Sequence, residues 1–328
     1  MSVFVSGATG YIGIQFVKRL SEKGLRVHAL YRSEEKALKI TFNGVDLFKG
    51  DILDIPSLET AMKGCSEAYH VAALAGIWPD DPSLFYRYNV EGALNVVRVA
   101  QEAGVRKVVV TSTAGILGPS THGQTVDENI PPPDSFFSTY ESSKYQMEQE
   151  LKKINPEDIE IVIVNPTRVY GPGLLSVSNG VTKMIKMYLK DNWRYLPGNG
   201  YQYGNYVFVE DVVTGLLLAM ERGKPGERYI LGGENLTYRQ LFQLVRENSN
   251  IKRKLFPVPL LLMLIFAAVI KSLSRITGRP PLIVPELVRK FNHHWIVSSE
   301  KAIREIGYNP VTADKGIGMT VNWIKENF

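Results

Sequence analysis

Residues 3–13 read Val-Phe-Val-Ser-Gly-Ala-Thr-Gly-Tyr-Ile-Gly and carry the strongest structural signal in the chain. Gly7, Gly10 and Gly13 stand between an apolar run typical of a strand and a helical pattern over residues 10–22. Glycines at these places allow a sharp turn, the close approach of a diphosphate, and tight packing of the helix on a sheet. Free amides at the start of the helix can hold that diphosphate. The stretch predicts a dinucleotide-binding turn, which also includes Thr9, Tyr11 and Ile12.

Strand and helix patterns alternate through the first half of the chain. Apolar runs predict strands at 3–5, 26–31, 44–48, 68–71, 107–111 and 159–164, and periodicity predicts helices at 10–22, 57–63, 84–103 and 140–154. Such alternation is typical of right-handed βαβ units. We expect an α/β fold, a doubly wound parallel Rossmann sheet with a smaller, discontinuous C-terminal substrate lobe. A TIM barrel, the alternative, would need eight comparable repeats, which the sequence lacks.

The regular alternation ends after Asn165, which suggests a division of the chain. We expect residues 1–171 to form the dinucleotide-binding domain, with returning segments at about 206–232. Residues 172–205 and 233–328 are then expected to form the substrate lobe.

Composition narrows the classes of function. The 328 residues are 45% hydrophobic and 22% charged, as in an ordinary globular protein. The net charge of +5 is spread along the chain, which argues against nucleic-acid binding. The single cysteine, Cys65, excludes an intramolecular disulfide and a cysteine-rich metal site. His293 and His294 are adjacent and do not share a helix face, so no metal is expected. No secretory signal is expected before the first strand, and a cytoplasmic location fits.

Residues 255–270 contain no charged side chain and are flanked by basic residues. Pro257 and Pro259 exclude a regular helix at the start, so a helix is expected over residues 260–270. A spanning helix needs about 20 apolar residues, which makes a true span the weakest interpretation. The helix is either buried in the C-terminal lobe or lies in a membrane interface, which would give a peripheral membrane contact.

The end of the second predicted strand distinguishes two nicotinamide cofactors. An acid about 20 positions after the glycines would bind a ribose 2′-hydroxyl, whereas an arginine accommodates a 2′-phosphate. Arg32 stands here with no acid beside it, so NADP is expected and NAD is the alternative. Asp51 and Ile52, after the third strand, are candidates for an adenine contact, although Asp51 could equally cap a helix.

Tyr140 and Lys144 stand four positions apart in a predicted helix and therefore share a face. A tyrosine with a pKa of about 10 is a poor base at neutral pH. A cation about 4 Å away, at an effective dielectric near 20, favours the phenolate by up to ~4 kcal/mol. We expect Lys144 to lower the pKa of Tyr140, so that the phenol can exchange a proton with a carbonyl or alcohol oxygen. Lys144 can also hold the nicotinamide ribose.

Hydroxyl groups follow the fifth predicted strand in the run Thr111-Ser112-Thr113. Ligands of doubly wound sheets bind at this carboxyl edge. A hydroxyl there can donate to a substrate oxygen and stabilise developing charge. Ser112 and Thr113 are both candidates.

Together these motifs resemble the extended short-chain dehydrogenase/reductase family over most of the chain. The glycine turn matches the family's G-x-x-G-x-x-G, and Tyr140 and Lys144 match its catalytic pair. The resemblance aligns the family's catalytic serine with Thr113, keeping Ser112 as the alternative. It also implies a supporting role for Asn89, and cofactor contacts from Ala72, Ala73 and Pro166, the last in Asn-Pro-Thr-Arg-Val-Tyr-Gly-Pro at 165–172.

Residues 111–118, Thr-Ser-Thr-Ala-Gly-Ile-Leu-Gly, are most similar to the dihydroflavonol-reductase and 3β-hydroxysteroid-dehydrogenase branch. The R-D-F segment of nucleotide-sugar enzymes is replaced by Gly204-Asn205-Tyr206. The resemblance therefore implies an NADP-preferring oxidoreductase that interconverts a carbonyl and an alcohol on a small, apolar or ring-like substrate. His122, in a nearby loop, is a candidate substrate contact.

Two alternatives stay open. One is a nucleotide-sugar epimerase that recycles its cofactor within the same site. The other is a non-catalytic regulatory protein that binds a dinucleotide, which would ordinarily lack Tyr140 or Lys144. Family members commonly form homodimers, so a homodimer is expected.

Overall fold

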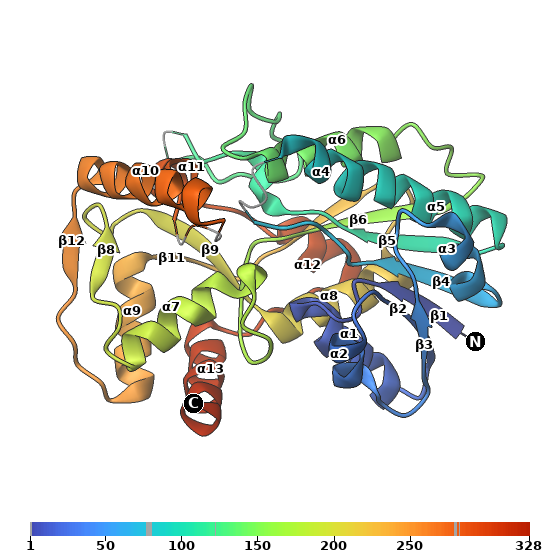
Figure 1. Ribbon diagram of the computed structural model, residues 1–328, viewed down its shortest axis with the longest axis horizontal. Coiled ribbons are helices and arrows are strands. Elements are labelled where there is room, and N and C mark those ends of the chain that lie inside the picture. The colour runs from blue at the N-terminus through green and yellow to red at the C-terminus, as the bar shows by residue number, and fades with distance from the viewer. Residues whose placement is uncertain (1, 77–80, 122, 279–280, 282) are drawn as a thin grey trace.

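The computed structural model of the protein describes residues 2–76, 81–121, 123–278, 281 and 283–328. Its centre is a seven-stranded sheet in the order β10-β6-β5-β4-β1-β2-β3, and all neighbouring strands in it are parallel (Figure 1). The strands are β1 (Ser2–Ser6), β2 (Arg26–Tyr31), β3 (Val45–Lys49), β4 (Cys65–His70), β5 (Lys107–Thr111), β6 (Glu160–Pro166) and β10 (Arg228–Leu231). The strand order reverses between β1 and β4. This topology confirms the predicted doubly wound Rossmann fold.

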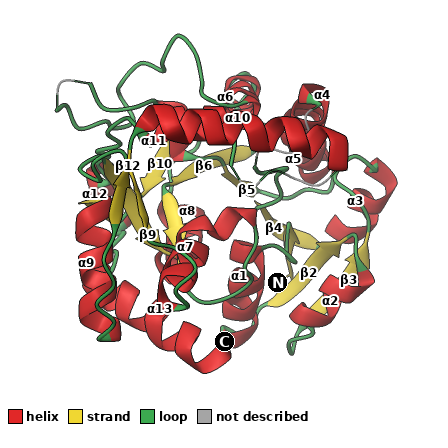
Figure 2. Cartoon of the chain, turned by 60° about the vertical axis from the view of Figure 1, so that its left-hand side comes forward, coloured by secondary structure: helices red, strands yellow, loops and turns green. Residues whose placement is uncertain are grey.

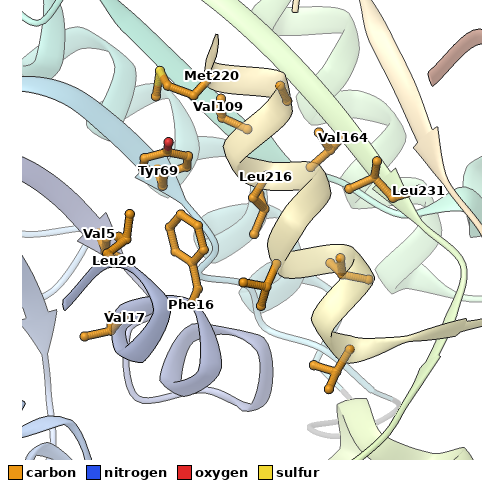
Figure 3. Close-up of a cluster of buried hydrophobic side chains, with 14 of the residues drawn as sticks. Val5, Phe16, Val17, Leu20, Tyr69, Val109, Val164, Leu216, Met220 and Leu231 are labelled. Carbon is orange, nitrogen blue, oxygen red and sulfur yellow. The ribbon is translucent and has the colours of Figure 1, made fainter. Parts of the chain in front are cut away.

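Helices cover both faces of this sheet. On one face, α1 (Tyr11–Glu22), α8 (Val209–Arg222) and α12 (Glu300–Ile306) bury apolar side chains such as Phe16 and Leu216 (Figure 3). On the other face, α3 (Ile55–Met62), α5 (Gly92–Glu102) and α6 (Thr139–Leu151) bury Leu58, Val97 and Met147. The short helices α2 (Glu34–Ala37) and η1 (Leu38–Ile40) follow β2. Strands buried on both sides explain the nearly continuous apolar runs in the sequence.

The helix predicted over residues 84–103 contains one irregular turn. It consists of α4 (Pro82–Tyr86), a π-helical turn η2 (Arg87–Glu91), and α5. Single π turns occur often at functional sites. Asn89 lies in this turn and is fully buried. The sequence predicted one continuous helix. A single π turn holds only one residue more than an α-helical turn, so the spacing of apolar positions changes very little and the turn was missed.

The chain beyond β6 forms two further small sheets. β7 (Arg168–Tyr170) pairs in parallel with β9 (Tyr203–Phe208), which pairs antiparallel with β11 (Glu234–Thr237). β8 (Tyr195–Pro197) pairs with β12 (Phe256–Val258). The helices α7 (Gly180–Leu189), α9 (Tyr238–Ser249) and α13 (Ala313–Asn327) enclose a separate apolar cluster next to these sheets (Figure 2). Two 3-10 turns, η3 (Ala114–Leu117) and η4 (Val177–Asn179), complete the elements before α7.

The apolar segment forms α10 (Leu260–Thr277), which is longer than the helix predicted over residues 260–270. The prediction stopped at the first charge, Lys271, but lysine is a good helix former. The helix ends instead at Gly278, where φ is +66°. α11 (Pro285–Phe291) follows and packs against α10. Within the described ranges, no helix combines the length and apolarity that crossing a membrane requires.

Candidate active site

The glycine turn lies at the carboxyl end of β1, beside the place where the strand order reverses. Gly7 has a φ of +73°, and a Cβ there would lie 2.5 Å from the backbone nitrogen of Ala72. Both facts require glycine at this position. Gly10 is the N-cap of α1 and makes no side-chain hydrogen bond to the helix amides. The first amides of α1 can therefore receive a diphosphate, and this cradle fits a dinucleotide.

The other residues near the glycine turn that were predicted to bind the cofactor differ in whether their side chains are free to do so. The Tyr11 side chain is buried, and its hydroxyl donates to the carbonyl oxygen of Gly171 at 3.1 Å. Ile12 packs against the core, and Thr9 is half-buried. Tyr11 and Ile12 can therefore contribute backbone amides at the start of α1 rather than side chains. After β4, Ala73 is exposed and Ala72 is half-buried beside Gly7.

Arg32 follows β2 at the same edge of the sheet. Its Nη1 lies 3.3 Å from Asp51 Oδ2, and its guanidinium lies 5.3 Å from the centre of the Tyr88 ring. Asp51 Oδ1 accepts a hydrogen bond from the Leu53 amide at 3.0 Å. The alternative that Asp51 caps a helix is wrong, because the N-cap of α3 is Asp54. Ile52 is buried, so of these positions Arg32 and Asp51 present polar groups at the cofactor edge.

Asn89 connects the loop after β4 with α6. Its Oδ1 accepts from the Leu74 amide at 2.8 Å, and its Nδ2 donates to the Leu74 carbonyl at 3.1 Å. The same Nδ2 donates to Ser143 Oγ at 2.9 Å. The π turn thus holds a loop at the cofactor edge against the helix that carries Tyr140.

Tyr140 lies in the first turn of α6, with the Thr113 side chain near its phenol. Burial raises the pKa of Tyr140 to about 12, with a further increase from the Glu141 carboxylate, and the neighbouring Thr113 hydroxyl opposes both. The expectation that Lys144 lowers the pKa of Tyr140 is therefore wrong. At neutral pH the phenol is protonated, which makes it a proton donor.

The Lys144 ammonium is bound elsewhere, which explains the difference. Its Nζ donates to the Thr111 carbonyl oxygen at 2.7 Å and lies 3.2 Å from Met147 Sδ. Burial lowers the pKa of Lys144 to about 8, with Glu148 acting in the opposite direction. Burial and the Lys144 charge together lower the pKa of His70 to about 3. His70 is therefore a neutral partner of Ser6, at 2.8 Å.

The two candidate hydroxyls have different surroundings. Thr113 lines a cavity, and its Oγ1 accepts from the Gly115 amide at 3.1 Å and lies near the Tyr140 phenol. Ser112 Oγ is buried and has no hydrogen-bond partner among the described residues. The geometry favours Thr113.

The Thr113 loop is held from behind by residues of the 165–172 segment. Asn165 Nδ2 donates to the Thr113 carbonyl oxygen at 3.2 Å and to Glu148 Oε1 at 2.7 Å. Arg228 Nη1 lies 3.6 Å from the other oxygen of the buried Glu148. Pro166 is buried at the end of β6, next to β5. This network fixes the loop that presents Thr113.

The cavity beside Thr113 has a volume of about 70 Å³. Residues from the loop after β5 and from the C-terminal elements line it together. Lys290 of α11 lines it and forms an ion pair with Glu141, the neighbour of Tyr140. Arg168 also lines it, and its Nη1 donates to the hydroxyls of Tyr206 at 3.3 Å and Tyr238 at 3.0 Å. The remaining lining residues are Ala114, Gly115, Thr167, Asn205, Trp295 and Val297. The cavity thus combines a hydroxyl, two cations and an apolar wall.

The remaining histidines have local partners. The His294 Nδ1 accepts from the Tyr203 amide at 3.3 Å, and the His293 ring lies 5.1 Å from that of Phe137. His122 lies outside the described residues. In the part of the chain that the structure describes, no three His, Cys, Asp or Glu side chains are placed to hold a metal ion.

Sequence reasoning missed Ser143, the Glu141–Lys290 pair and the position of Arg168. Glu141 and Lys290 are 149 positions apart, so no local pattern could connect them. Ser143 could have been found, because it lies three positions after Tyr140 on the same helix and immediately before Lys144.

Comparisons with known proteins identify the family and agree with the fold. Residues 3–232 match the model of the "NAD dependent epimerase/dehydratase family". The chain is 31% identical to the "Putative dihydroflavonol 4-reductase" of Synechocystis sp., over 99% of this chain and 94% of that protein. It is 30% identical to the 4-hydroxy-2-methyl-3-oxo-4-farnesyl-3,4-dihydroquinoline-1-oxide ketoreductase of Stigmatella aurantiaca, over 97% and 95% of the two chains. The structure of the UDP-glucose 4-epimerase of Thermotoga maritima superposes with a TM-score of 0.82 at 23% identity, and 99% of each chain is covered.

Proposed function

Because the chain belongs to the NAD dependent epimerase/dehydratase family, we propose that it is an NADP-preferring oxidoreductase that interconverts a carbonyl and an alcohol. The observation that carries this proposal is that the Tyr140 phenol lies near the hydroxyl of Thr113, which lines the cavity. A phenol and a hydroxyl placed together can both address one substrate oxygen.

Tyr140 is the proposed proton donor for carbonyl reduction. Bound NAD(P)H would supply the hydride that reduces the carbonyl carbon. As negative charge develops on the substrate oxygen, the Tyr140 hydroxyl gives it a proton and the C=O becomes C–OH. Thr113 donates a hydrogen bond to the same oxygen and so stabilises the charge before the proton arrives. The raised pKa of Tyr140, about 12, keeps this donor protonated at neutral pH.

Lys144 and Asn89 are proposed to support this step. The buried Lys144 ammonium donates to the Thr111 carbonyl at the end of β5, two residues before Thr113, and so holds the start of the loop that carries Thr113. Asn89 bonds both the Leu74 loop and α6, so the distance between the cofactor edge of the sheet and the proton donor stays fixed.

A preference for NADP is supported by Arg32 and by the lack of an acid at the end of β2. Arg32 Nη1 lies at the long end of the hydrogen-bond range from Asp51, at 3.3 Å, and the side chain is 64% exposed. A 2′-phosphate would offer the guanidinium more acceptor oxygens and more negative charge than this carboxylate does.

An apolar or ring-like substrate is supported by Trp295 and Val297 in the cavity wall. The names of the two relatives, a dihydroflavonol reductase and a farnesyl-dihydroquinoline ketoreductase, also specify ring compounds. Arg168 and Lys290 would then receive the polar end of the molecule.

The test combines a substrate screen with two variants. Aromatic and long-chain ketones are offered with NADPH or NADH, and nicotinamide absorbance is followed. Replacing Tyr140 by Phe should lower kcat by about 10²–10⁴ without changing NADPH affinity, because the proton donor is lost and the binding turn is intact. Tyr145→Phe, five positions along the same helix, is the matched control.

Three outcomes would contradict the proposal. Full activity in the Tyr140→Phe variant would remove the phenol from the reaction. Interconversion of nucleotide sugars without net change in nicotinamide absorbance would identify an epimerase. A dinucleotide that binds while no substrate turns over would support the regulatory alternative.

A further inference from the structure

The outer face of α10 is mostly apolar, with the exposed Ser272 as a polar exception. Seven large side chains on it are between 52% and 82% exposed: Leu261, Leu262, Ile265, Phe266, Val269, Leu273 and Ile276. Their spacing of three to four residues places them on one side of the helix. Figure 1 shows α10 along the edge of the molecule away from the N-terminus, and Figure 2 shows it in front, across the molecule. The interpretation of this segment as a buried helix is therefore wrong for this face of α10.

The opposite face of α10 is held by the protein. Ala267 and Ser274 are buried, and Lys271 Nζ lies 2.8 Å from Glu286 Oε1 at the start of α11. The outer face therefore cannot turn inward without breaking these contacts. An ordinary surface helix has a polar outer face. α9 is such a helix, with Arg239, Gln240, Gln243 and Glu247 exposed on its outer side.

The charged residues of the segment 248–285, which contains α10, all have one sign, and the acid next to it, Glu286, is paired with Lys271. Residues 248–285 contain six Lys or Arg and no Asp or Glu. Lys252 and Lys254, before the helix, have exposed side chains, and Phe256 beside them is 42% exposed. An apolar helix between basic segments is complementary to an anionic lipid surface, where acyl chains receive the apolar face and headgroups receive the cations.

A second copy of the chain fits the outer face of α10 less well than an anionic lipid surface does, because the basic residues of the two copies would repel one another. In a parallel pairing of two α10 helices, each basic end would meet the same basic end of its partner. In an antiparallel pairing, residues 252–254 would meet the segment after Lys271, which is also basic. Neither arrangement offers an acid from residues 248–285 to offset this repulsion.

We propose that α10 is a docking surface for anionic lipid bilayers and lies parallel to the membrane plane. Its 18 residues would extend for about 27 Å along the interface. α11, fixed to the inner face of α10, carries Lys290 at the cavity. If the proposed function holds, this contact also places the cavity close to the lipid phase that stores apolar substrates.

The test is vesicle flotation of the purified full chain. Vesicles contain phosphatidylcholine alone or with about one third phosphatidylglycerol. The protein should float with the anionic vesicles, and binding should fall by roughly tenfold or more without the anionic lipid or at about 0.5 M salt. This readout does not depend on turnover, so it can fail independently of the proposed function.

Two variants test whether α10 is the element that binds the vesicles. Leu262→Asp combined with Phe266→Asp should lower flotation by roughly tenfold or more, because two large apolar side chains leave the lipid contact. Leu38→Asp, on η1, changes a 73% exposed leucine on another element and should float like the wild type. Circular dichroism and melting curves establish that the variants are folded.

Three results would overturn the proposal. The first is a wild type that floats with neither vesicle, and the second is an α10 double variant that floats as well as the wild type. A double variant that converts a dimer into a monomer in light scattering, with flotation unchanged, would identify the face as a contact between copies. Reversal of the anionic preference in Lys252→Glu with Lys254→Glu would support the assigned role of the basic flank.

Discussion

Replacing Lys290 by Met removes the cation that pairs with Glu141 beside the proposed proton donor. The Glu141 side chain is 2% exposed and that of Lys290 is 25% exposed. Loss of one partner of a buried pair costs about 3–5 kcal/mol, because the other charge stays buried without compensation. Since Lys290 is partly exposed, we expect the lower end, about 3 kcal/mol. With an unfolding entropy of about 2.1 cal/mol/K per residue, the 328-residue chain should lose about 4 °C in Tm.

Differential scanning calorimetry and urea unfolding measure this loss of stability. Two further variants test whether it comes from the unpaired buried charge. Glu141→Gln combined with Lys290→Met should recover most of the loss, because Gln is neutral and can still accept from the Phe137 amide, now 3.1 Å from Glu141. Lys153→Met is the surface control: Lys153 pairs with Glu150 at 2.8 Å but is 67% exposed, so we expect under about 1 kcal/mol. Equal losses in the single and double Lys290 variants would refute the charge argument. The effect would then come from packing of Lys290 on the Trp295 ring, 4.6 Å away.

The site supports four other predictions. Asn89→Leu should weaken NADPH binding by up to roughly thirtyfold, because the Leu74 loop loses two hydrogen bonds worth about 1 kcal/mol each; an unchanged fluorescence titration would contradict this. The kcat/KM of ketone reduction should fall as pH rises through about 8, where Lys144 loses its charge while Tyr140 stays protonated, and Lys144→Met should abolish this limb of the profile. The unfolded lysine binds more protons than the folded one between pH 8 and about 10.4, so the free energy of unfolding should rise with pH there. Arg32→Ala should raise the Kd of NADPH by about tenfold relative to NADH, whereas Arg26→Ala, at the other end of β2, should leave this ratio unchanged.

Much of the central sheet could be predicted because its signals are local. β5 is fully buried and reads as a continuous apolar run with Lys107 at its start, and the glycines after β1 sit where a strand turns into a helix. The short strands β7, β8 and β12 were not predicted. Each has three residues, too few to show a period, and each is stabilised by a partner distant in sequence.

The site was predictable in its residue types but not in its electrostatics. Tyr140, Thr113 and Asn89 were identified by spacing and resemblance, and the structure brings the first two close together. The sign of the Tyr140 pKa shift depends on burial and on where the Lys144 ammonium is bound, and neither can be read from a four-residue spacing. The contact of Lys290 with Glu141 could not be predicted, because it depends on how the C-terminal part of the chain folds back onto α6.

The junction between β6 and β7 limits how the enzyme can move. β6 ends at Pro166 and β7 begins at Arg168, so the single residue Thr167 separates the central sheet from the next one. Its amide donates to the Leu231 carbonyl at 3.2 Å and its hydroxyl to Asn205 Oδ1 at 2.8 Å, which fastens it on both sides. Hinge closure requires backbone dihedrals that are free to change. Substrate selection in this molecule should therefore depend on the rotamers of Trp295, Arg168 and Lys290 rather than on a clamshell movement of two halves.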